Sequence, residues 1–166
     1  YETCRGAVRA TARFGARAGT GLRDARTRIR LGDFGDLLSR GGEYDVILGQ
    51  TSGKWTNLAS RVTTREFLDL ARRKLGDGGV YCHWIPGSSL TREGLRILLA
   101  TFADVYPYVG VYATVEDADL VLLGSERPLV PAPEVAEYFS RRWPVAWEVF
   151  NQVGISDPLA VTAMFQ

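Results

Sequence analysis

Between positions 44 and 85, short apolar runs alternate with a stretch in which apolar residues recur at helical spacing. Short apolar runs at 44–48 and 80–85 are typical of buried parallel strands. Between them, apolar residues recur at helical spacing after Thr64, whose hydroxyl suits a helix N-cap. A strand, a helix and a second strand predict a right-handed crossover unit, which places ligand chemistry at the carboxyl ends of the strands.

The rest of the chain continues the alternation of helices and strands. Trp143 and Trp147, one helical turn apart, predict a packing face in a C-terminal helical segment. Strands that alternate with helices and end in a hairpin predict an α/β, Rossmann-like doubly wound, mostly parallel sheet with an antiparallel C-terminal edge hairpin. We expect one domain over 1–166, with 130–166 as a helical extension. The other expected elements are helices at 5–18 and 34–38, a helix that is capped by Thr91 and runs through Phe102, a strand at 27–31, and an antiparallel pair at 109–114 and 120–124.

Composition narrows the classes of protein. The 166 residues are 46% hydrophobic and 23% charged, with a formal net charge of +1, which gives no global argument for nucleic-acid binding. No apolar run is long enough to enter and cross a bilayer. The arginine-rich first 30 residues fit a solvated, salt-bridged helix surface better than a phosphate-binding face, which stays open.

Few residues could bind metal or act as nucleophiles. Cys4, Cys82 and His83 form no metal-ligand spacing, so we expect no metal site. Two reduced thiols indicate a cytoplasmic protein. His83 lies in the middle of a predicted strand, where a structural histidine is expected. Ser52 has no His or Asp at a recognisable spacing, which excludes a hydrolase triad.

Three segments carry the patterns of one family. Residues 22–38 resemble D-P-R-V-x-V-x-x-G-D-G-R-x-F-L, residues 44–55 resemble Y-D-V-I-x-x-D-S-S-D-P, and residues 63–86 resemble F-T-x-E-F-F-x-x-x-R-x-x-L-x-P-G-G-V-x-x-x-W-L-P. These are motifs of the spermidine synthase (polyamine aminopropyltransferase) family, within the class I S-adenosylmethionine-dependent methyltransferase superfamily. The tail at 154–159 is similar to the variants fused to membrane transporter segments. The resemblance, over residues 2–165, implies a small adenosyl ligand: S-adenosylmethionine, its decarboxylated form or methylthioadenosine.

The resemblance also implies roles for residues at strand ends. Glu2 falls where an acidic residue accepts hydrogen bonds from ribose hydroxyls, although an exposed terminal acid is an equal alternative. Asp33 matches the residue that binds the adenine amino group, and it also suits a helix N-cap. The implied cofactor-binding residues are Glu2, Asp33, Phe34 and Gln50, and the implied substrate loop contains Thr51, Ser52 and Trp55.

Gln50 departs from the family pattern at the position of its catalytic acid. Aminopropyl transfer needs a primary amine to lose a proton, and the family supplies a carboxylate for this. A glutamine is neutral at every pH and cannot accept that proton, while Gly53 and Lys54 make the loop less acidic. We therefore expect a divergent adenosyl-binding domain that is not a standard aminopropyltransferase. An active aminopropyl- or methyltransferase is the alternative, because methyl transfer can depend on positioning alone.

The family pattern also places a strand and a glycine-rich turn before Glu2. Gly19 and Gly21 do not replace that turn, because they follow a predicted helix. The first strand is normally central in the sheet, so its absence would leave unpaired backbone on its neighbours. The sequence therefore predicts one of two situations. Either it is part of a longer chain, or the sheet is completed by direct pairing of the remaining strands or by a strand of another chain. A homodimer is one of these alternatives.

Overall fold

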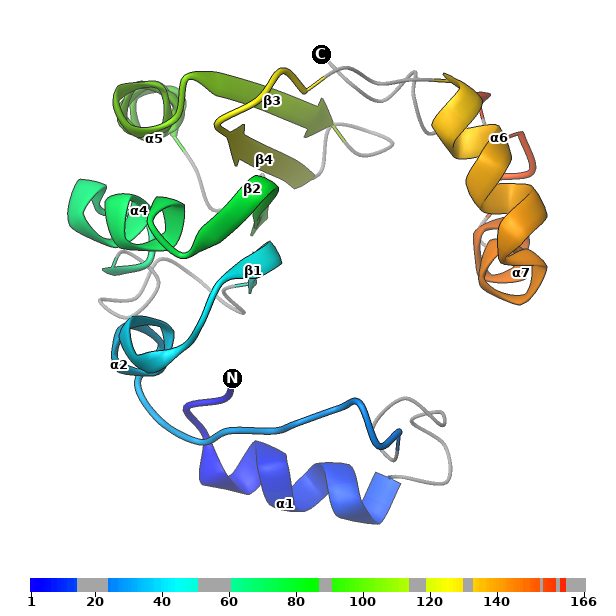
Figure 1. Cartoon of the computed structure of the whole chain (residues 1–166), viewed down its shortest axis with the longest axis horizontal. Helices are drawn as coiled ribbons and strands as arrows, with labels where there is room; N and C mark the ends of the chain where they lie inside the picture. The colour runs from blue at the N-terminus through cyan, green and yellow to red at the C-terminus, as the bar shows by residue number, and fades with distance from the viewer. Residues whose placement is uncertain are drawn as a thin grey trace. The chain divides into compact units, whose positions relative to one another are not determined.

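The chain forms two compact units, Tyr1–Glu43 and Tyr44–Gln166, in the computed structural model (Figure 1). The expectation that residues 1–166 form one domain stays a prediction. The structure describes residues 1–14, 24–50, 61–86, 91–113, 119–129, 133–152, 154–157 and 159–160.

The first unit contains helices α1 (Arg5–Phe14) and α2 (Phe34–Arg40) and a parallel bridge. The backbone N–H of Glu2 donates to the Arg30 carbonyl at 2.9 Å, and the N–H of Gly32 donates to the Glu2 carbonyl at 3.0 Å. The strand expected at 27–31 is thus a single bridge at Leu31. A turn explains this difference, because the Asp24 carboxylate accepts bonds from the backbone and side chain of Arg26 and competes with extended pairing.

The second unit is built on a four-stranded sheet with the order β1-β2-β4-β3. Strands β1 and β2 pair in parallel, whereas β4 is antiparallel to both β2 and β3. The sheet of the described residues is therefore mixed, with one parallel pair and two antiparallel pairs, which confirms an open α/β sheet with an antiparallel C-terminal hairpin. The strands are β1 (Tyr44–Gln50), β2 (Leu75–Pro86), β3 (Tyr108–Ala113) and β4 (Asp119–Ser125).

Strand β2 begins five residues earlier than the apolar run predicted. Tyr44 pairs with Leu75, but Val46 already pairs with Val80, so the ladder contains an irregularity between these pairs. Gly78 has a φ of 76°, a left-handed conformation that favours glycine. The glycine-rich segment at 76–79 therefore forms a bulge inside the strand.

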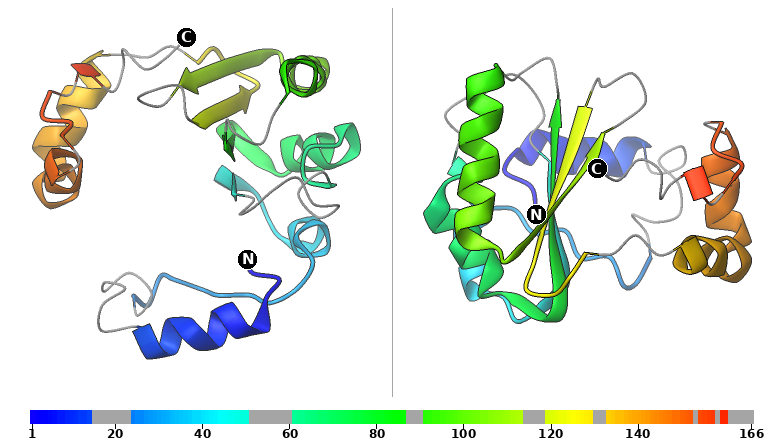
Figure 2. Two further views of the ribbon diagram at one scale, coloured as in Figure 1. Left: turned by 180° about the vertical axis from the view of Figure 1, so that it is seen from behind. Right: turned by 90° about the horizontal axis from the view of Figure 1, so that it is seen from above.

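Helices α4 (Arg65–Arg72) and α5 (Arg92–Val105) cover one face of the sheet (Figure 2). The buried ring of Tyr81 in β2 lies 6.3 Å from the ring of Phe67 in α4 and 5.8 Å from that of Phe102 in α5. Thr64 and Thr91 cap these helices, since their hydroxyls accept bonds from the N–H groups three residues later at 3.3 and 3.0 Å. Both caps match the expectations from the sequence.

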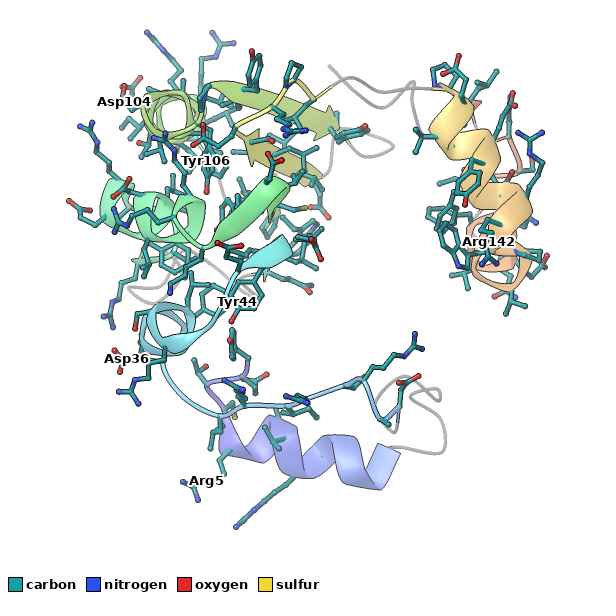
Figure 3. The ribbon with its side chains drawn as sticks, viewed as in Figure 1. Arg5, Asp36, Tyr44, Asp104, Tyr106 and Arg142 are labelled. Atoms are coloured by element: carbon teal, nitrogen blue, oxygen red, sulfur yellow. The ribbon has the colours of Figure 1, made fainter. Side chains whose placement is uncertain are left out.

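Tyr106 contacts both α4 and β4 from its position at the end of α5. This tyrosine, labelled in Figure 3, follows α5 and donates its hydroxyl proton to the Leu68 carbonyl of α4 at 3.1 Å. Its ring covers Gly124 of β4 so closely that an added Cβ would lie 2.4 Å from a ring carbon. The buried core of this unit thus spans the helices and the sheet.

The C-terminal segment forms helices α6 (Pro133–Arg142) and α7 (Pro144–Gln152). The ring of Trp143 lies 5.3 Å from that of Phe139, and the ring of Trp147 lies 5.1 Å from that of Phe150. The two tryptophans therefore contribute to an aromatic packing face, as their spacing predicted.

Candidate functional site

Gln50 ends β1, at the carboxyl edge of the parallel β1–β2 pair. Its register partner in β2 is Trp84, and both side chains belong to the face opposite Ile47 and Tyr81, which are buried towards the helices. The Gln50 side chain is exposed and Trp84 is half-buried. A glutamine there can donate and accept hydrogen bonds but cannot take up a proton. Thr51, Ser52 and Trp55, the predicted substrate-loop residues, lie outside the described residues.

A buried polar pair lies on the helix side of the same strand ends. His83 Nδ1 is 3.3 Å from the Tyr81 hydroxyl, which in turn donates to the Val62 carbonyl at 3.3 Å. Gly49 lies against this pair, because an added Cβ would approach His83 Nδ1 to 2.7 Å and the Tyr81 oxygen to 3.0 Å. Since Val62 follows the 51–60 segment, the pair fixes the chain where it returns to the sheet.

Burial determines the protonation of these two side chains. It lowers the pKa of His83 to about 4 and raises the pKa of Tyr81 well above its usual value. Both groups are therefore neutral near pH 7. His83 is a buried, hydrogen-bonded structural histidine, as its position in the sequence indicated.

In the first unit, the parallel bridge places Glu2 beside Leu31, two residues before Asp33. Glu2 Oε1 accepts a bond from the Cys4 backbone N–H at 2.7 Å, and Cys4 directly precedes α1, where its carbonyl accepts bonds from the first helical turn. The other oxygen, Oε2, has no hydrogen bond within the described part of the chain. Glu2 thus orders the start of a helix with one oxygen and presents a second acceptor.

Asp33 is the N-cap of α2. Its Oδ1 accepts bonds from the N–H groups of Gly35 at 2.9 Å and Asp36 at 3.3 Å, so the N-cap reading of the sequence is correct. Its suggested role towards an adenine stays a prediction. The next residue, Phe34, makes an edge contact with the ring of Tyr1 at 5.7 Å. Glu2, Asp33 and Phe34 therefore bring two carboxylates and an aromatic ring to the bridge, whereas Gln50 belongs to the other unit.

Neither a metal centre nor a membrane span is found in the described ranges. They contain no group of three or more His, Cys, Asp or Glu side chains that could hold a metal ion. Within those same ranges, no helix has the length and apolar character needed to cross a membrane. In the first unit, Glu2 and Asp33 offer hydrogen-bond acceptors near the ring of Phe34, and in the second unit Gln50 offers its amide beside Trp84.

Sequence reasoning did not find the Gly49–His83 contact or the pairing of Gln50 with Trp84. Both depend on the register of two strands that are far apart in the chain. A weak signal was present, because Gly49 lies between an apolar run and the strand's last residue, and a glycine within a strand often marks a close approach of another group.

The fold is shared with solved structures of spermidine synthases. A probable spermidine synthase from Corynebacterium glutamicum matches with 22% identity and a TM-score of 0.55, over 72% of this chain and 45% of that one. The spermidine synthase of Thermotoga maritima has 19% identity and a TM-score of 0.60, over 76% and 44% of the two chains. A spermidine synthase in complex with the transition state analogue AdoDATO has 17% identity and a TM-score of 0.61, over 76% and 45%.

These matches show the fold of the chain. The chain has a Rossmann-like α/β fold. More particularly, it is a spermidine-synthase-like fold, as the sequence motifs indicated. No family model and no curated protein matches the chain. It spans less than half the length of the three similar structures.

Proposed function

We propose that the chain is a divergent spermidine-synthase-like domain that binds S-adenosylmethionine or a related adenosyl ligand and does not catalyse standard aminopropyl transfer. The observation that carries this proposal is Gln50, an exposed neutral side chain at the carboxyl end of β1. The free thiols of Cys4 and Cys82 support a cytoplasmic location.

The chemistry of aminopropyl transfer explains why Gln50 matters. The attacking primary amine must lose its proton before its lone pair can form a bond to carbon. A carboxylate at a strand end can both attract the protonated amine by its charge and accept the proton, whereas a neutral amide can only hydrogen-bond the amine and cannot take its proton. His83 does not replace it, because this side chain is buried on the helix side and its pKa lies near 4.

The first unit supports adenosyl binding. A ligand with ribose hydroxyls and a purine amino group needs acceptors for its protons, and Glu2 Oε2 and the exposed Asp33 carboxylate are suited to this. Phe34 adds an aromatic surface at the same bridge. A similar structure contains the transition state analogue AdoDATO. The residues present therefore fit the nucleoside part of such a ligand.

An active transferase is the second candidate. The likeness to spermidine synthase structures favours it, and transfer of a methyl group does not require a protein base when the acceptor is well positioned. In that case Gln50 would orient the acceptor through its amide.

Calorimetric titration tests the ligand. We expect heat on adding S-adenosylmethionine, its decarboxylated form or methylthioadenosine, and weaker binding by roughly tenfold for Glu2→Gln, since one charged acceptor is lost. Asp33→Asn should also weaken binding while asparagine still caps α2. Ser39→Ala, in the exposed part of α2, serves as the matched control. Absence of heat for all three ligands would remove both functions.

An aminopropyl assay separates the two functions. With decarboxylated S-adenosylmethionine and putrescine we expect no product above the uncatalysed reaction, because Gln50 cannot take the amine proton. Turnover at the rate of ordinary enzymes, about 1 per second or faster, would refute the proposed loss of aminopropyl transfer even if binding is confirmed.

A further inference from the structure

The buried pair of His83 and Tyr81 joins three segments of the second unit. Tyr81 Oη lies 3.3 Å from His83 Nδ1 within β2 and 3.3 Å from the carbonyl oxygen of Val62, two residues before the cap of α4. Gly49, the register partner of His83 in β1, lies against both side chains. The end of β1 and the start of α4 therefore meet at the same two polar side chains of β2.

The number of protons in this cluster is limited. A tyrosine hydroxyl has one proton, a carbonyl oxygen has none, and a neutral imidazole carries its proton on either Nδ1 or Nε2. Burial raises the pKa of Tyr81 well above its usual value and lowers the pKa of His83 to about 4, so both side chains are neutral near pH 7. The tyrosine proton can therefore serve only one of the two contacts of Tyr81 Oη.

One arrangement alone puts a proton into both contacts. If Nδ1 of His83 carries the imidazole proton, it donates to Tyr81 Oη, and the hydroxyl donates to the Val62 carbonyl. If Nε2 carries it instead, the tyrosine proton serves either Nδ1 or the carbonyl, and the remaining contact brings two lone pairs together. Tyr81 and His83 are 0% and 1% exposed, so water does not replace a hydrogen bond that is lost there.

Gly49 connects this cluster to Gln50. A Cβ added at position 49 would lie 2.7 Å from His83 Nδ1 and 3.0 Å from Tyr81 Oη, the two atoms that share the imidazole proton in the favoured arrangement. The glycine backbone thus packs directly against that hydrogen bond. A shift of either atom changes the packing of residue 49, and Gln50 is the next residue of the strand.

We propose that His83, as the Nδ1–H tautomer, and Tyr81 are positioning residues for the strand end that carries Gln50. The hydrogen-bond chain runs from His83 Nδ1 through Tyr81 Oη to the Val62 carbonyl. It holds the start of α4 on β2, and the contact with Gly49 holds the end of β1 at the same place. The chain of bonds is independent of the proposed function, whereas its effect on a ligand rests on that function.

Nitrogen-15 NMR of the whole chain tests the tautomer. The chain contains one histidine, so its two ring nitrogens give an unambiguous pair of signals. At pH 7 we expect the signal of a protonated nitrogen for Nδ1 and that of an unprotonated nitrogen for Nε2. The reverse assignment, or signals averaged between the two tautomers, would overturn the proposal.

Tyr106 provides a matched control for Tyr81. Both tyrosines are buried, and each donates its hydroxyl proton to a backbone carbonyl; the acceptor of Tyr106 is Leu68, in the middle of α4. Tyr81→Phe and Tyr106→Phe therefore remove similar hydrogen bonds and should lower the thermal midpoint of unfolding by similar amounts.

Local readouts distinguish a positioning role from a merely structural one. Only Tyr81→Phe should move the ring-nitrogen signals of His83 and speed amide exchange at Val62 and Gln50, by about tenfold or more, because these sites then open without global unfolding. Equal changes in Tyr81→Phe and Tyr106→Phe would overturn the proposal.

Substitution of His83 tests the direction of the bond. Asparagine carries an amide N–H group on Cγ, where histidine carries Nδ1, so His83→Asn should keep the slow exchange at Val62 and Gln50. His83→Leu has no donor and should exchange as fast as Tyr81→Phe. Equally fast exchange in both His83 variants would show that the Nδ1 donor is not what holds these segments.

Calorimetric titration with S-adenosylmethionine connects the chain of bonds to the proposed function. We expect the affinity of Tyr81→Phe to be about fivefold or more below that of Tyr106→Phe, because the strand end that carries Gln50 is displaced. No binding by the unmodified chain would refute the proposed function, while the NMR and exchange results still decide the bond chain. Binding by the unmodified chain with equal affinities of the two tyrosine variants would refute the positioning role.

Discussion

At the scale of single residues, Gly49 and His83 depend on each other. The histidine ring occupies the space that any side chain at position 49 would need. In return, the ring is shielded from water and hydrogen-bonded to Tyr81. This contact couples the strand that ends in Gln50 to the strand that carries Trp84, without any charged group.

Burial of neutral His83 makes stability depend on pH. Its pKa is about 4 in the folded chain and about 6.5 when unfolded, so the unfolded state binds more protons between these values. Stability from this group is complete above pH 6.5 and is lost as the pH falls towards 4. We expect His83 to lower the free energy of unfolding by about 3 kcal/mol between pH 7 and pH 4.

Chemical denaturation at several pH values measures this loss. His83→Gln keeps a polar side chain beside Tyr81 but does not titrate, so its unfolding free energy should fall less steeply over the same range. Carboxylates contribute equally to both curves, and their difference isolates the histidine. Parallel curves would show that His83 is not held neutral.

At the scale of elements, α4 depends on its N-cap. The Thr64 hydroxyl satisfies the N–H of Phe67, and the helix buries Phe67, Leu68 and Ala71 in the core. Thr64→Ala should lower the free energy of unfolding by about 1 kcal/mol, because an N–H of the first turn loses its partner. Thermal or denaturant unfolding provides the measurement.

Thr64→Ser is the control for this prediction. Serine keeps the hydroxyl and should retain most of the stability. If alanine and serine have the same effect, the loss comes from the methyl group and not from the cap.

The sequence predicted elements well where their causes are local. The caps Thr64 and Thr91 and the helical spacing that follows them depend on residues within a few positions. The strand at 27–31 was overestimated, because its alternation competes with the Asp24–Arg26 turn. The extent of β2 could not be read from its glycines, because the bulge exists only through pairing with β1.

In the candidate site, too, features with local causes were predictable and features that depend on strand pairing were not. The position of Gln50 at a strand end was predictable, because the apolar run stops there. The N-cap role of Asp33 was predictable as well. That Glu2 lies beside Leu31, or Gln50 beside Trp84, depends on pairing between distant segments, which periodicity alone does not define.

At the scale of the whole molecule, the two units carry opposite charge. Residues 1–43 contain nine arginines and five acidic residues, whereas residues 44–166 contain eleven basic and fourteen acidic residues. The formal net charge of +1 therefore hides a basic unit and an acidic unit. Such a division allows the units to be separated by charge once the chain is cut between them.

Limited proteolysis with a glutamate-specific protease tests the unit boundary. Glu43 is exposed and ends the first unit, so we expect cleavage there before cleavage at Glu66 or Glu93, which lie in helices. Ion exchange should then separate a basic fragment from an acidic one, and mass spectrometry identifies them.

Glu43→Gln should abolish this first cut and leave slower cuts unchanged. Initial cleavage inside α4 or α5 would contradict the boundary at Glu43.

The pairing of Gln50 with Trp84 has an optical consequence. The half-buried indole of Trp84 pairs in register with Gln50, the residue that cannot act as the base for aminopropyl transfer. A molecule that settles there changes the polarity around the indole and shifts its fluorescence. The chain has four tryptophans, so the spectrum of Trp84→Phe, subtracted from that of the unmodified chain, isolates the signal of this one. Trp84 is therefore an intrinsic fluorescent probe of ligand binding at this strand end.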